Sequence, residues 1–151
     1  MADPVREVTT QGLRTALLDV RIEMAAITHA VARSADLNDG DLSCLDIIHR
    51  ERQISPTELA RRTAIHAATM TGIIRRLEEH GWIERIAHPE DGRAVLLRMP
   101  RDRALRLAAL YRDANRRVDA AGQSRSPQER EVVATYLRDV RAALHESFQA
   151  R

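Results

Sequence analysis

The stretch ISPTELARRTAIHAATMTGIIRRLEEHGWIERIAHPEDGRAVLLRMP, residues 54–100, contains the start signals of two short helices and a turn between two apolar runs. Ser55 is a typical helix N-cap, Pro56 suits the first helical position, and Glu58 completes a capping box. After a short break a second helix is predicted to continue until Gly81, because glycine commonly ends a helix. Two short helices with a tight connection indicate a helix-turn-helix.

The second helix has one apolar side, and an apolar hairpin follows it. At about 100° per residue the apolar side carries Met70, Ile73, Ile74 and Leu77. Trp82–Ala87 and Ala94–Met99 are predicted strands, joined by the turn HPEDG at residues 88–92. If Asp91 and Arg93 both belong to the returning strand, they lie on one face, where the carboxylate can hold the guanidinium. Helix, helix and hairpin in this order indicate a winged helix.

Long helices with heptad seams are predicted on both sides of this stretch. Apolar residues recur at alternating spacings of four and three in three helices. The seam of the first helix is Leu13, Leu17, Val20, Met24, Ile27 and Val31, and that of a fifth helix after Pro100 is Leu107, Tyr111, Ala114, Val118 and Ala121. Ser126, Pro127 and Glu129 start the last helix, whose seam is Val133, Leu137, Val140, Leu144 and Phe148. This is more apolar surface than one short chain readily covers, so the seams predict an obligate homodimer.

A further helix is expected between the first helix and Ser55, and it completes the predicted architecture. It begins with LNDGDLSCLDIIHRE, where Asn38 is an N-cap, and it is apolar on more than one side, as expected of a helix sandwiched between lobes. The fold class is mainly α with a small β-hairpin wing. The expected parts are an N-terminal dimerisation helix at 1–36, a winged helix-turn-helix lobe at 37–99 and C-terminal dimerisation helices at 100–151.

The composition restricts the class of protein further. The 151 residues are 44% hydrophobic, enough for a real core, and all 24 basic residues are arginine, with a formal net charge of only +2. Any nucleic-acid surface must therefore be local. A single cysteine allows no intrachain disulfide, the apolar stretches are too short for a membrane span, and MADPVREV at the N-terminus has no signal-peptide pattern. An intracellular, cytoplasmic protein is expected.

A basic face is predicted on the helix-turn-helix. Arg61, Arg62, Arg75 and Arg76 fall in a segment without acidic residues. The side of the second helix opposite its core presents Ala68, Gly72 and Arg75, flanked by Thr69, Thr71 and Arg76. Small residues there would let the helix backbone approach base edges closely. The alternative is a solvated helix face, with Gly72 a mid-helix defect that costs about 1 kcal/mol relative to alanine.

The helix pair and hairpin together resemble the core of MarR-family transcriptional regulators. The matching features are a "tELA" helix, a recognition helix with Thr69 and Thr71, the run RLEEHGWIER, and a wing with an Asp-x-Arg pair at Asp91 and Arg93. The first helix, LNDGDLSCLDII and two C-terminal helices also fit the family's layout, so the resemblance covers nearly the whole chain. Gly72 departs from it, because the family often has a larger, commonly basic residue there.

The resemblance implies a homodimeric, sequence-specific DNA-binding regulator, a repressor, that acts on an inverted-repeat operator in double-stranded DNA. The recognition helix would enter the major groove, Arg93 the minor groove, and Ser55 with Arg61 or Arg62 would meet phosphates. The expected DNA-binding residues are Ser55, Arg61, Arg62, His66, Ala68, Thr69, Thr71, Gly72, Arg75, Arg76, Asp91 and Arg93. The family also implies a small aromatic ligand. The competing hypothesis is a dimeric helical protein-interaction module without specific DNA binding.

Other chemistry has little support in the sequence. Cys44 lies within an apolar helix, where a cysteine usually serves as a small core residue. Asp46 and His49 are spaced to share a metal, but no third ligand follows at helical spacing, so a structural role is favoured and no metal is expected. No nucleophile elbow, phosphate loop, paired-carboxylate site or HExxH helix is present. An enzyme is not expected, nor is a cofactor.

Overall fold

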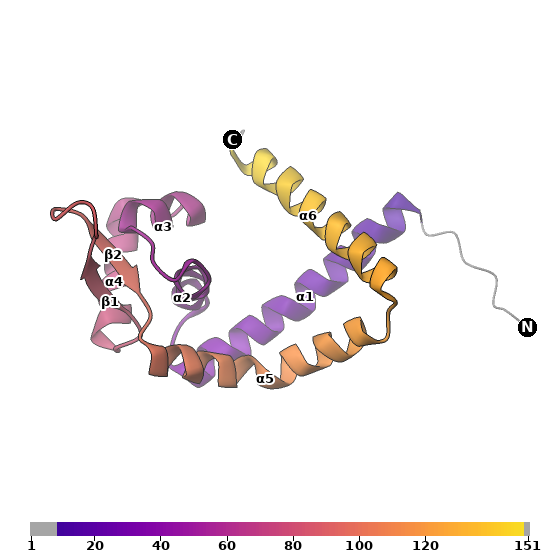
Figure 1. Ribbon diagram of the computed structural model, residues 1–151, viewed down its shortest axis with the longest axis horizontal. Helices are drawn as coiled ribbons and strands as arrows, with labels where there is room; N and C mark the ends of the chain where they lie inside the picture. The colour runs from indigo at the N-terminus through magenta and orange to yellow at the C-terminus, as the bar shows by residue number, and fades with distance from the viewer. Residues whose placement is uncertain (1–8, 150–151) are drawn as a thin grey trace, which may run out of the picture. The chain divides into compact units, whose positions relative to one another are not determined.

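The computed structural model describes the backbone of residues 9–149 and the side chains up to residue 147. The described part holds six helices and one hairpin (Figure 1): α1 Thr10–Ala35, α2 Asp39–Glu51, α3 Pro56–Thr63, α4 Ala67–Glu79, β1 Glu84–Ala87, β2 Val95–Arg98, α5 Arg101–Gln123 and α6 Pro127–Gln149. Within this part, every helix is too short or too polar to cross a bilayer. The segment MADPVREV, for which no signal peptide is expected, and the side chain of Phe148 lie outside the described residues.

The chain divides into two compact units, and the division falls inside α5. The first unit ends at Tyr111 and the second, which contains the rest of α5 and all of α6, begins at Arg112. The core of the first unit includes Val31 near the end of α1 and Leu107 in the first half of α5. The winged helix-turn-helix therefore shares one core with parts of both flanking helices. The three-part division by role, with boundaries after residues 36 and 99, stays a prediction.

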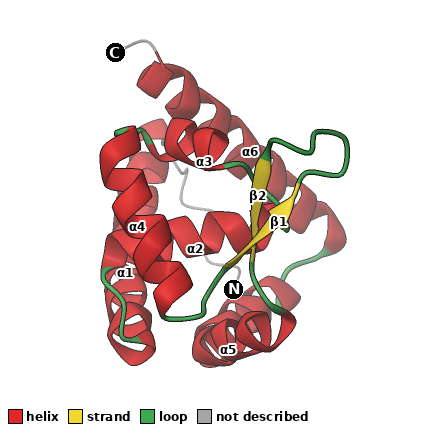
Figure 2. Cartoon of the chain, turned by 90° about the vertical axis from the view of Figure 1, so that its left-hand side faces the viewer, coloured by secondary structure: helices red, strands yellow, loops and turns green. Residues whose placement is uncertain are grey.

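Helix α2 lies at the centre of the first unit, as its apolar residues on several sides predict. It contacts α1, α3, α4 and β2, and Figure 2 shows it between α4 and the hairpin. Leu42, Leu45 and Ile48 of α2 are fully buried. Complete burial of a leucine or isoleucine side chain stabilises the fold by about 1.5–3 kcal/mol. The predicted packing of this helix on several sides is confirmed, but it lies within one unit and not between two lobes.

Polar caps fix the starts of the helices as the sequence predicts. Asn38 accepts a hydrogen bond from the Asp41 backbone N–H at 2.8 Å, and Ser55 accepts one from that of Glu58 at 3.2 Å. Each cap satisfies an N–H group that has no partner within its own helix, which typically contributes about 1 kcal/mol. Gly81, with φ +66°, follows α4, and glycine adopts this left-handed conformation without a steric penalty.

The hairpin is shorter than predicted. Its antiparallel register pairs Glu84 with Arg98 and Ala87 with Val95, so four residues of each arm form strand. The predicted strands began at Trp82 and ended at Met99, but both of these side chains are buried in the core and lie outside the ladder. Ile54 adds a single bridge on the other side of β2 by exchanging two backbone hydrogen bonds with Leu97, at 3.1 and 2.8 Å. This bridge ties the start of the helix-turn-helix to the wing.

The chain's one tryptophan connects the hairpin to the beginning of α5. Trp82 is buried, and the guanidinium carbons of Arg103 and Arg106 lie 5.8 and 5.0 Å from the centroid of its ring. Cations over an aromatic face are attracted by the ring's electron density, and the contact is stronger where water is excluded. These two arginines therefore cover Trp82 in place of a further apolar residue.

The heptad seams are exposed over most of their length. On α1 the residue nearest the core, Val31, is buried, whereas Met24 is 62% exposed. In the second unit, Leu144 of α6 is 66% exposed. The full set of large apolar residues exposed on these two helices is Leu18, Val20, Ile22, Met24, Ile27, Val132, Val133, Leu137 and Leu144. Large apolar residues exposed along one helix are typical of interaction surfaces.

Candidate nucleic-acid interface

Helix α4 separates core and surface as its sequence predicts. Met70, Ile73, Ile74 and Leu77 are buried, which confirms the predicted core side. On the opposite side Ala68, Thr69, Thr71 and Arg75 are exposed. A Cβ atom added to Gly72 would meet only the Arg76 Nη1 atom at 3.8 Å, an ordinary contact, so packing within the chain does not require a glycine there. The fold of the chain therefore does not itself require the small residue at position 72 on the exposed side of α4.

The turn that leads into α4 leaves this side open. Ala64 has a left-handed conformation, with φ 52°, and closes α3. His66 is exposed at the N-cap position of α4 but its side chain makes no capping hydrogen bond. The Thr71 hydroxyl donates to the Ala67 carbonyl at 2.9 Å, which fixes its rotamer and keeps its methyl group on the exposed side. A methyl group and small residues suit close approach to a flat surface such as a base pair.

The arginines of α3 are paired with acidic residues. The Glu58 carboxylate accepts hydrogen bonds from Arg61 at 2.8 and 2.7 Å and from Arg62 at 2.8 Å, and Arg62 also donates to Glu51 at 2.6 Å. These bonds to Arg61 and Arg62 lower the pKa of Glu58 to about 2. The predicted capping box is therefore half correct. Ser55 caps α3, but the Glu58 carboxylate binds the two arginines and not the Ser55 backbone N–H, as a capping box requires.

The two arginines of α4 differ in their surroundings. Arg75 is 75% exposed, and its Nε atom lies 3.7 Å from Glu79. Arg76 donates from Nε and Nη2 to the two carboxylate oxygens of Asp41, at 3.0 and 2.7 Å. The Asp41 side chain is only 4% exposed but that of Arg76 is 43% exposed, so the pair joins a buried carboxylate of α2 to a half-exposed arginine of α4. The Arg76 guanidinium is therefore directed to Asp41, whereas Arg75 extends from the exposed side.

The predicted basic face is consequently weaker than its sequence suggests. The segment from Arg61 to Leu77 contains no acidic residue, but folding brings Glu51, Glu58 and Asp41 from outside it to the arginines. Asp41 could not be identified as the partner of Arg76, because they are 35 positions apart. The sequence held one sign of this partnership: Asp41 is an acidic residue of α2 whose neighbours Leu42 and Leu45 are apolar.

The wing loop places Asp91 and Arg93 differently from the prediction. Residues 88–94 connect the strands, so neither residue belongs to the returning strand and that prediction is wrong. Asp91 Oδ1 accepts a hydrogen bond from the Arg93 backbone N–H at 3.0 Å, and the Ala94 N–H donates to the Asp91 carbonyl at 3.0 Å. The carboxylate thus forms an Asx turn that fixes the loop backbone. No ion pair joins it to the exposed Arg93 guanidinium in the described structure.

The loop has a second internal support. Nδ1 of His88 accepts a hydrogen bond from the Glu90 N–H at 3.2 Å, and the His88 N–H donates to the Ala94 carbonyl at 3.0 Å. The loop is therefore ordered by four hydrogen bonds of its own residues. Arg93 extends from an ordered support, with its side chain available to a partner.

Cys44 and Asp46 have structural positions, as expected. Burial, with a smaller contribution from Asp41, raises the pKa of the Cys44 thiol to about 11, which makes it a poor nucleophile at neutral pH. Asp46 accepts a hydrogen bond from the Tyr111 hydroxyl at 3.0 Å, which joins α2 to α5, and its burial raises its pKa. No group of three His, Cys, Asp or Glu side chains in residues 9–147 could hold a metal ion.

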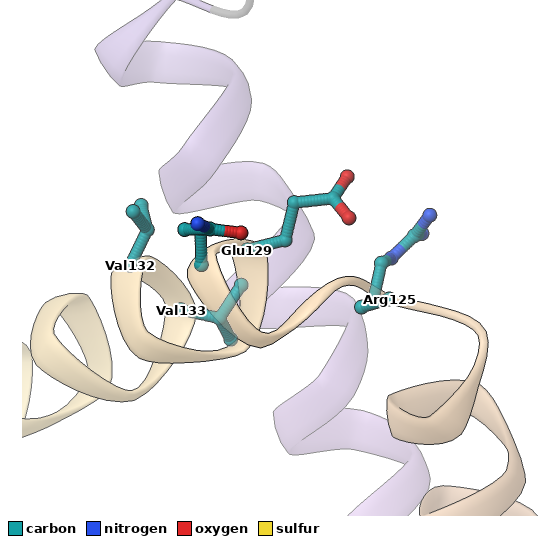
Figure 3. Close-up of a pocket in the computed structure, with 5 residues that line it drawn as sticks. Arg125, Glu129, Val132 and Val133 are labelled. Atoms are coloured by element: carbon teal, nitrogen blue, oxygen red, sulfur yellow. The ribbon is translucent and has the colours of Figure 1, made fainter.

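A shallow hollow lies in the second unit, where α6 begins. Figure 3 shows Arg125 and Glu129 at its edge with Val132 and Val133, and Gln128 completes the lining. Its volume is about 320 Å³ and its surface is almost entirely apolar. The two valines belong to the exposed apolar residues of α6, so the hollow is part of that interaction surface and carries no polar chemistry of its own.

Comparison with known sequences gives the family of this lobe. The family model of the MarR family matches residues 37–95, which span α2, the helix-turn-helix and most of the wing. The HTH-type transcriptional repressor YetL of Bacillus subtilis (strain 168) is 25% identical over 126 residues, 82% of this chain and 75% of YetL. An HTH-type transcriptional regulator of Mycobacterium tuberculosis (strain CDC 1551 / Oshkosh) is 34% identical over 64 residues, 42% of this chain but only 45% of that regulator.

Solved structures share the fold over nearly the whole chain. Streptococcus pneumoniae FabT in complex with DNA has a TM-score of 0.71 at 20% identity, covering 91% of this chain and 99% of FabT. A mutant of MepR from a multidrug-resistant S. aureus clinical isolate has a TM-score of 0.75 at 15% identity, with 92% and 99% coverage. NadR in complex with 4-hydroxyphenylacetate has a TM-score of 0.65 at 18% identity, with 93% and 97% coverage. The predicted fold class, mainly helical with a winged helix-turn-helix, is confirmed.

The matched segment and the curated relatives agree on transcriptional regulators, a class of protein that is not enzymatic. The curated relatives named above are transcriptional regulators, and the family model covers the lobe that contains the exposed side of α4 and the wing. Residues 37–95 of this chain, which contain the winged helix-turn-helix, therefore match the MarR family.

Proposed function

We propose that this protein acts in the cytoplasm as a homodimeric repressor that binds an inverted-repeat operator. The observation that carries the proposal is the exposed side of α4, with Ala68, Thr69, Thr71 and Arg75, on the same lobe as a wing loop whose backbone Asp91 orders and from which Arg93 extends. FabT, a protein of the same fold, has been solved with DNA, and YetL is a repressor. Each supports the proposal by analogy.

The proposed contacts follow from exposure and chemistry. Thr69, Thr71 and Arg75 would contact base edges in the major groove. The small residues Ala68 and Gly72 would let α4 approach the bases closely, and His66 would lie at the N-terminus of α4, where the helix enters the groove. Ser55, Arg61 and Arg62 would lie near phosphates. For these arginines the pairing with Glu58 implies a weaker phosphate contact than free guanidinium groups would make.

The homodimer is proposed because of the exposed apolar residues on α1 and α6. Met24 and Leu144 are 62% and 66% exposed. A stable folded chain seldom exposes so many large apolar side chains to water. Covering them with a second copy would produce a two-fold dimer with two equivalent recognition helices. The two half-sites of the operator should then lie about 10 base pairs apart, centre to centre.

Selection of bound fragments from a random DNA pool, followed by footprinting, tests the function directly. The expected result is an inverted repeat whose affinity falls steeply with salt concentration. Arg75→Ala should weaken binding to this site, whereas Arg141→Ala, which removes the same charge from α6 in the second unit, should have little effect. Weak, salt-insensitive binding without a preferred sequence would contradict the proposal and favour a protein-interaction module.

The wing offers a separate test. Arg93→Ala should weaken operator binding by about 1–3 kcal/mol and reduce the slope of log K against log salt by about one per subunit, as a lost cationic contact does. Asp91→Ala should also weaken binding, although it removes a negative charge, because the loop that presents Arg93 loses its Asx turn. Asp91→Asn should bind nearly as wild type, since an asparagine side chain makes the same turn. Tighter binding of Asp91→Ala to all DNA would refute this role.

The proposal includes a response to a small aromatic ligand. NadR, which shares the fold, has been solved with 4-hydroxyphenylacetate. A compound that binds the folded protein raises its melting temperature, and an effector would also release the operator. A thermal-shift series of aromatic acids, including 4-hydroxyphenylacetate, with DNA release as the second readout, tests the response. Compounds that shift neither quantity at millimolar concentration would argue against it.

A further inference from the structure

The position of Arg76 differs from that of every other arginine in the helix-turn-helix. Its partner Asp41 is nearly buried, with 4% of its side chain exposed, and the two residues form two hydrogen bonds, at 3.0 and 2.7 Å. The other three, Arg61, Arg62 and Arg75, pair only with partly or fully exposed glutamates. A fork of two bonds to a carboxylate fixes both distance and orientation.

Asp41 is itself fixed in place. It lies in the first turn of α2, and its backbone N–H donates to the Asn38 side chain at 2.8 Å. Leu42 and Leu45, its neighbours on the same helix, are fully buried, so the carboxylate cannot move without disturbing the core of the unit. A buried charge left without its partner is strongly unfavourable, which ties Arg76 to this position.

Apolar side chains and two polar side-chain contacts join α4 to the rest of the described unit. Met70, Ile73, Ile74 and Leu77 bury its core side. Near the end of α4, Glu78 accepts one hydrogen bond from Arg85 Nε of β1 at 2.8 Å. The contact of Arg76 with Asp41 has two hydrogen bonds, which need defined angles, so it restricts rotation of α4 about its axis and helps to set the direction in which the exposed residues of α4 point.

We infer that Arg76 is a positioning residue of the recognition helix, which acts through Asp41 and does not contact DNA. This inference rests on the proposed DNA binding. It reassigns Arg76 from the groove contacts expected from the sequence to the support of Thr69, Thr71 and Arg75. It also makes Asp41, an acidic residue of α2, a determinant of operator specificity.

The decisive variant is Asp41→Asn, because the two roles of Arg76 predict opposite signs. If Arg76 positions α4, releasing it misaligns the helix and operator affinity falls, about tenfold, with little change for random DNA. If Arg76 is a DNA contact that Asp41 restrains, releasing it adds a free cation and both affinities rise. Arg76→Ala should reproduce the loss seen for Asp41→Asn, and the double variant should be no worse than either alone, since one interaction is removed in each case.

Salt dependence separates positioning from phosphate contact. In Arg76→Ala the slope of log K against log salt should stay at the wild-type value, whereas Arg75→Ala, the comparison for a true contact, should lose about one unit per subunit. Arg76→Lys keeps one charge-assisted bond to Asp41 and should recover part of the affinity. Tyr111→Phe is the matched control for stability, because it removes another polar bond of α2, to Asp46, without touching α4. It should bind the operator as wild type does.

The outcomes are distinguishable. Unchanged or tighter operator binding by Asp41→Asn, or a reduced salt slope in Arg76→Ala, would overturn the inference while leaving the proposed function intact. Failure of the wild-type protein to prefer any DNA sequence would overturn both. Melting temperatures of the two single variants and the double variant give a readout without DNA. Arg76→Ala, which leaves the buried Asp41 carboxylate unpaired, should lower the melting temperature most, and the double variant should lower it less. Additive shifts would show that the residues act independently.

Discussion

Helices α3 and α6 both begin with the pattern Ser-Pro-x-Glu, as SPTE at residues 55–58 and SPQE at 126–129. Both serine side chains accept a hydrogen bond from the backbone N–H of the glutamate, at 3.2 Å in each case. The glutamates then differ. Glu129 returns to the Ser126 N–H at 2.7 Å and completes a capping box, whereas Glu58 binds Arg61 and Arg62. The same pattern starts both helices, but the neighbouring side chains decide what the glutamate does.

The apolar sides of the two helices differ in the same way. Leu59 of α3 is fully buried against α4 and the hairpin, whereas Leu137 of α6 is 49% exposed. Helix α3 thus gains its stability from the chain to which it belongs. Helix α6 carries a comparable seam that is exposed, and the dimer proposed above would cover it.

The largest expected effect is on the free energy of unfolding, and it distinguishes stability from packing within the chain from stability from a second copy. Leu59→Ala should lower the free energy of unfolding by about 2–5 kcal/mol, because it leaves a cavity in a closed core. The loss should be independent of protein concentration. Leu137→Ala should instead cost more in dilute than in concentrated protein, since a dimer is stabilised by mass action. Urea unfolding at two protein concentrations, about 100-fold apart, measures both.

Leu105→Ala is the control for an exposed apolar residue of the first unit, at 64% exposure. It should change stability by less than about 0.5 kcal/mol. If Leu137→Ala behaved like this control at every concentration, the exposed side of α6 would not be an interface between copies.

The serine caps should have equal effects, because their geometry is equal. Ser55→Ala and Ser126→Ala should each lower the free energy of unfolding by about 1 kcal/mol, while Ser→Gly at either site should cost only a few tenths. Thermal unfolding followed by circular dichroism measures the four variants. A clearly larger effect at Ser55 would indicate a second role for this hydroxyl, beyond capping.

The glutamates should have smaller and different effects. Glu129→Ala removes half of a capping box, so it should cost less stability than Ser126→Ala does. Glu58→Ala removes no capping bond from its side chain but releases Arg61 and Arg62. It should therefore tighten binding to random DNA and steepen its salt dependence. Equal salt slopes for Glu58→Ala and wild type would show that these arginines do not reach phosphates.

The smallest expected effect concerns acid stability. The Arg61 and Arg62 hydrogen bonds lower the pKa of Glu58 from 4.5 to about 2 in the folded chain. A carboxylate with a lowered folded pKa contributes stability that is complete above the unfolded pKa and is lost as the pH falls through the folded one. The contribution of Glu58 should thus disappear between pH 4.5 and about 2. A carboxyl NMR titration would detect it, and a midpoint near 4.5 would contradict the pairing.

Sequence alone was sufficient for most of the fold. The caps at Asn38, Ser55 and Ser126, the stop near Gly81 and the core side of α4 all depend on residues within one or two helical turns, and all are confirmed. The prediction of a small hairpin is confirmed too, although each of its strands is two residues shorter than predicted. Local patterns specify local structure, since the chemistry involved acts over a few positions.

The site was predictable only in part, because side-chain partners depend on the tertiary fold. The exposed side of α4 followed from helical periodicity, but the pairing of Arg76 with Asp41 joins residues 35 positions apart. A strand through Asp91 and Arg93 would direct the carboxylate to the guanidinium, but both residues lie in the loop, where the carboxylate binds the backbone. The charge pattern of a sequence does not show which acidic residues the tertiary fold will place beside a given arginine.

The packing of Arg103 and Arg106 over Trp82 gives the molecule a built-in optical reporter. Trp82 is the chain's one tryptophan and it is buried in the first unit, so tryptophan fluorescence, excited selectively over tyrosine, follows the unfolding of that unit alone. Far-ultraviolet circular dichroism is dominated by all six helices, including α6. Coincident fluorescence and dichroism transitions would mean that both units unfold together, whereas a dichroism change that precedes the fluorescence change would mean that α6 melts while the winged lobe stays folded.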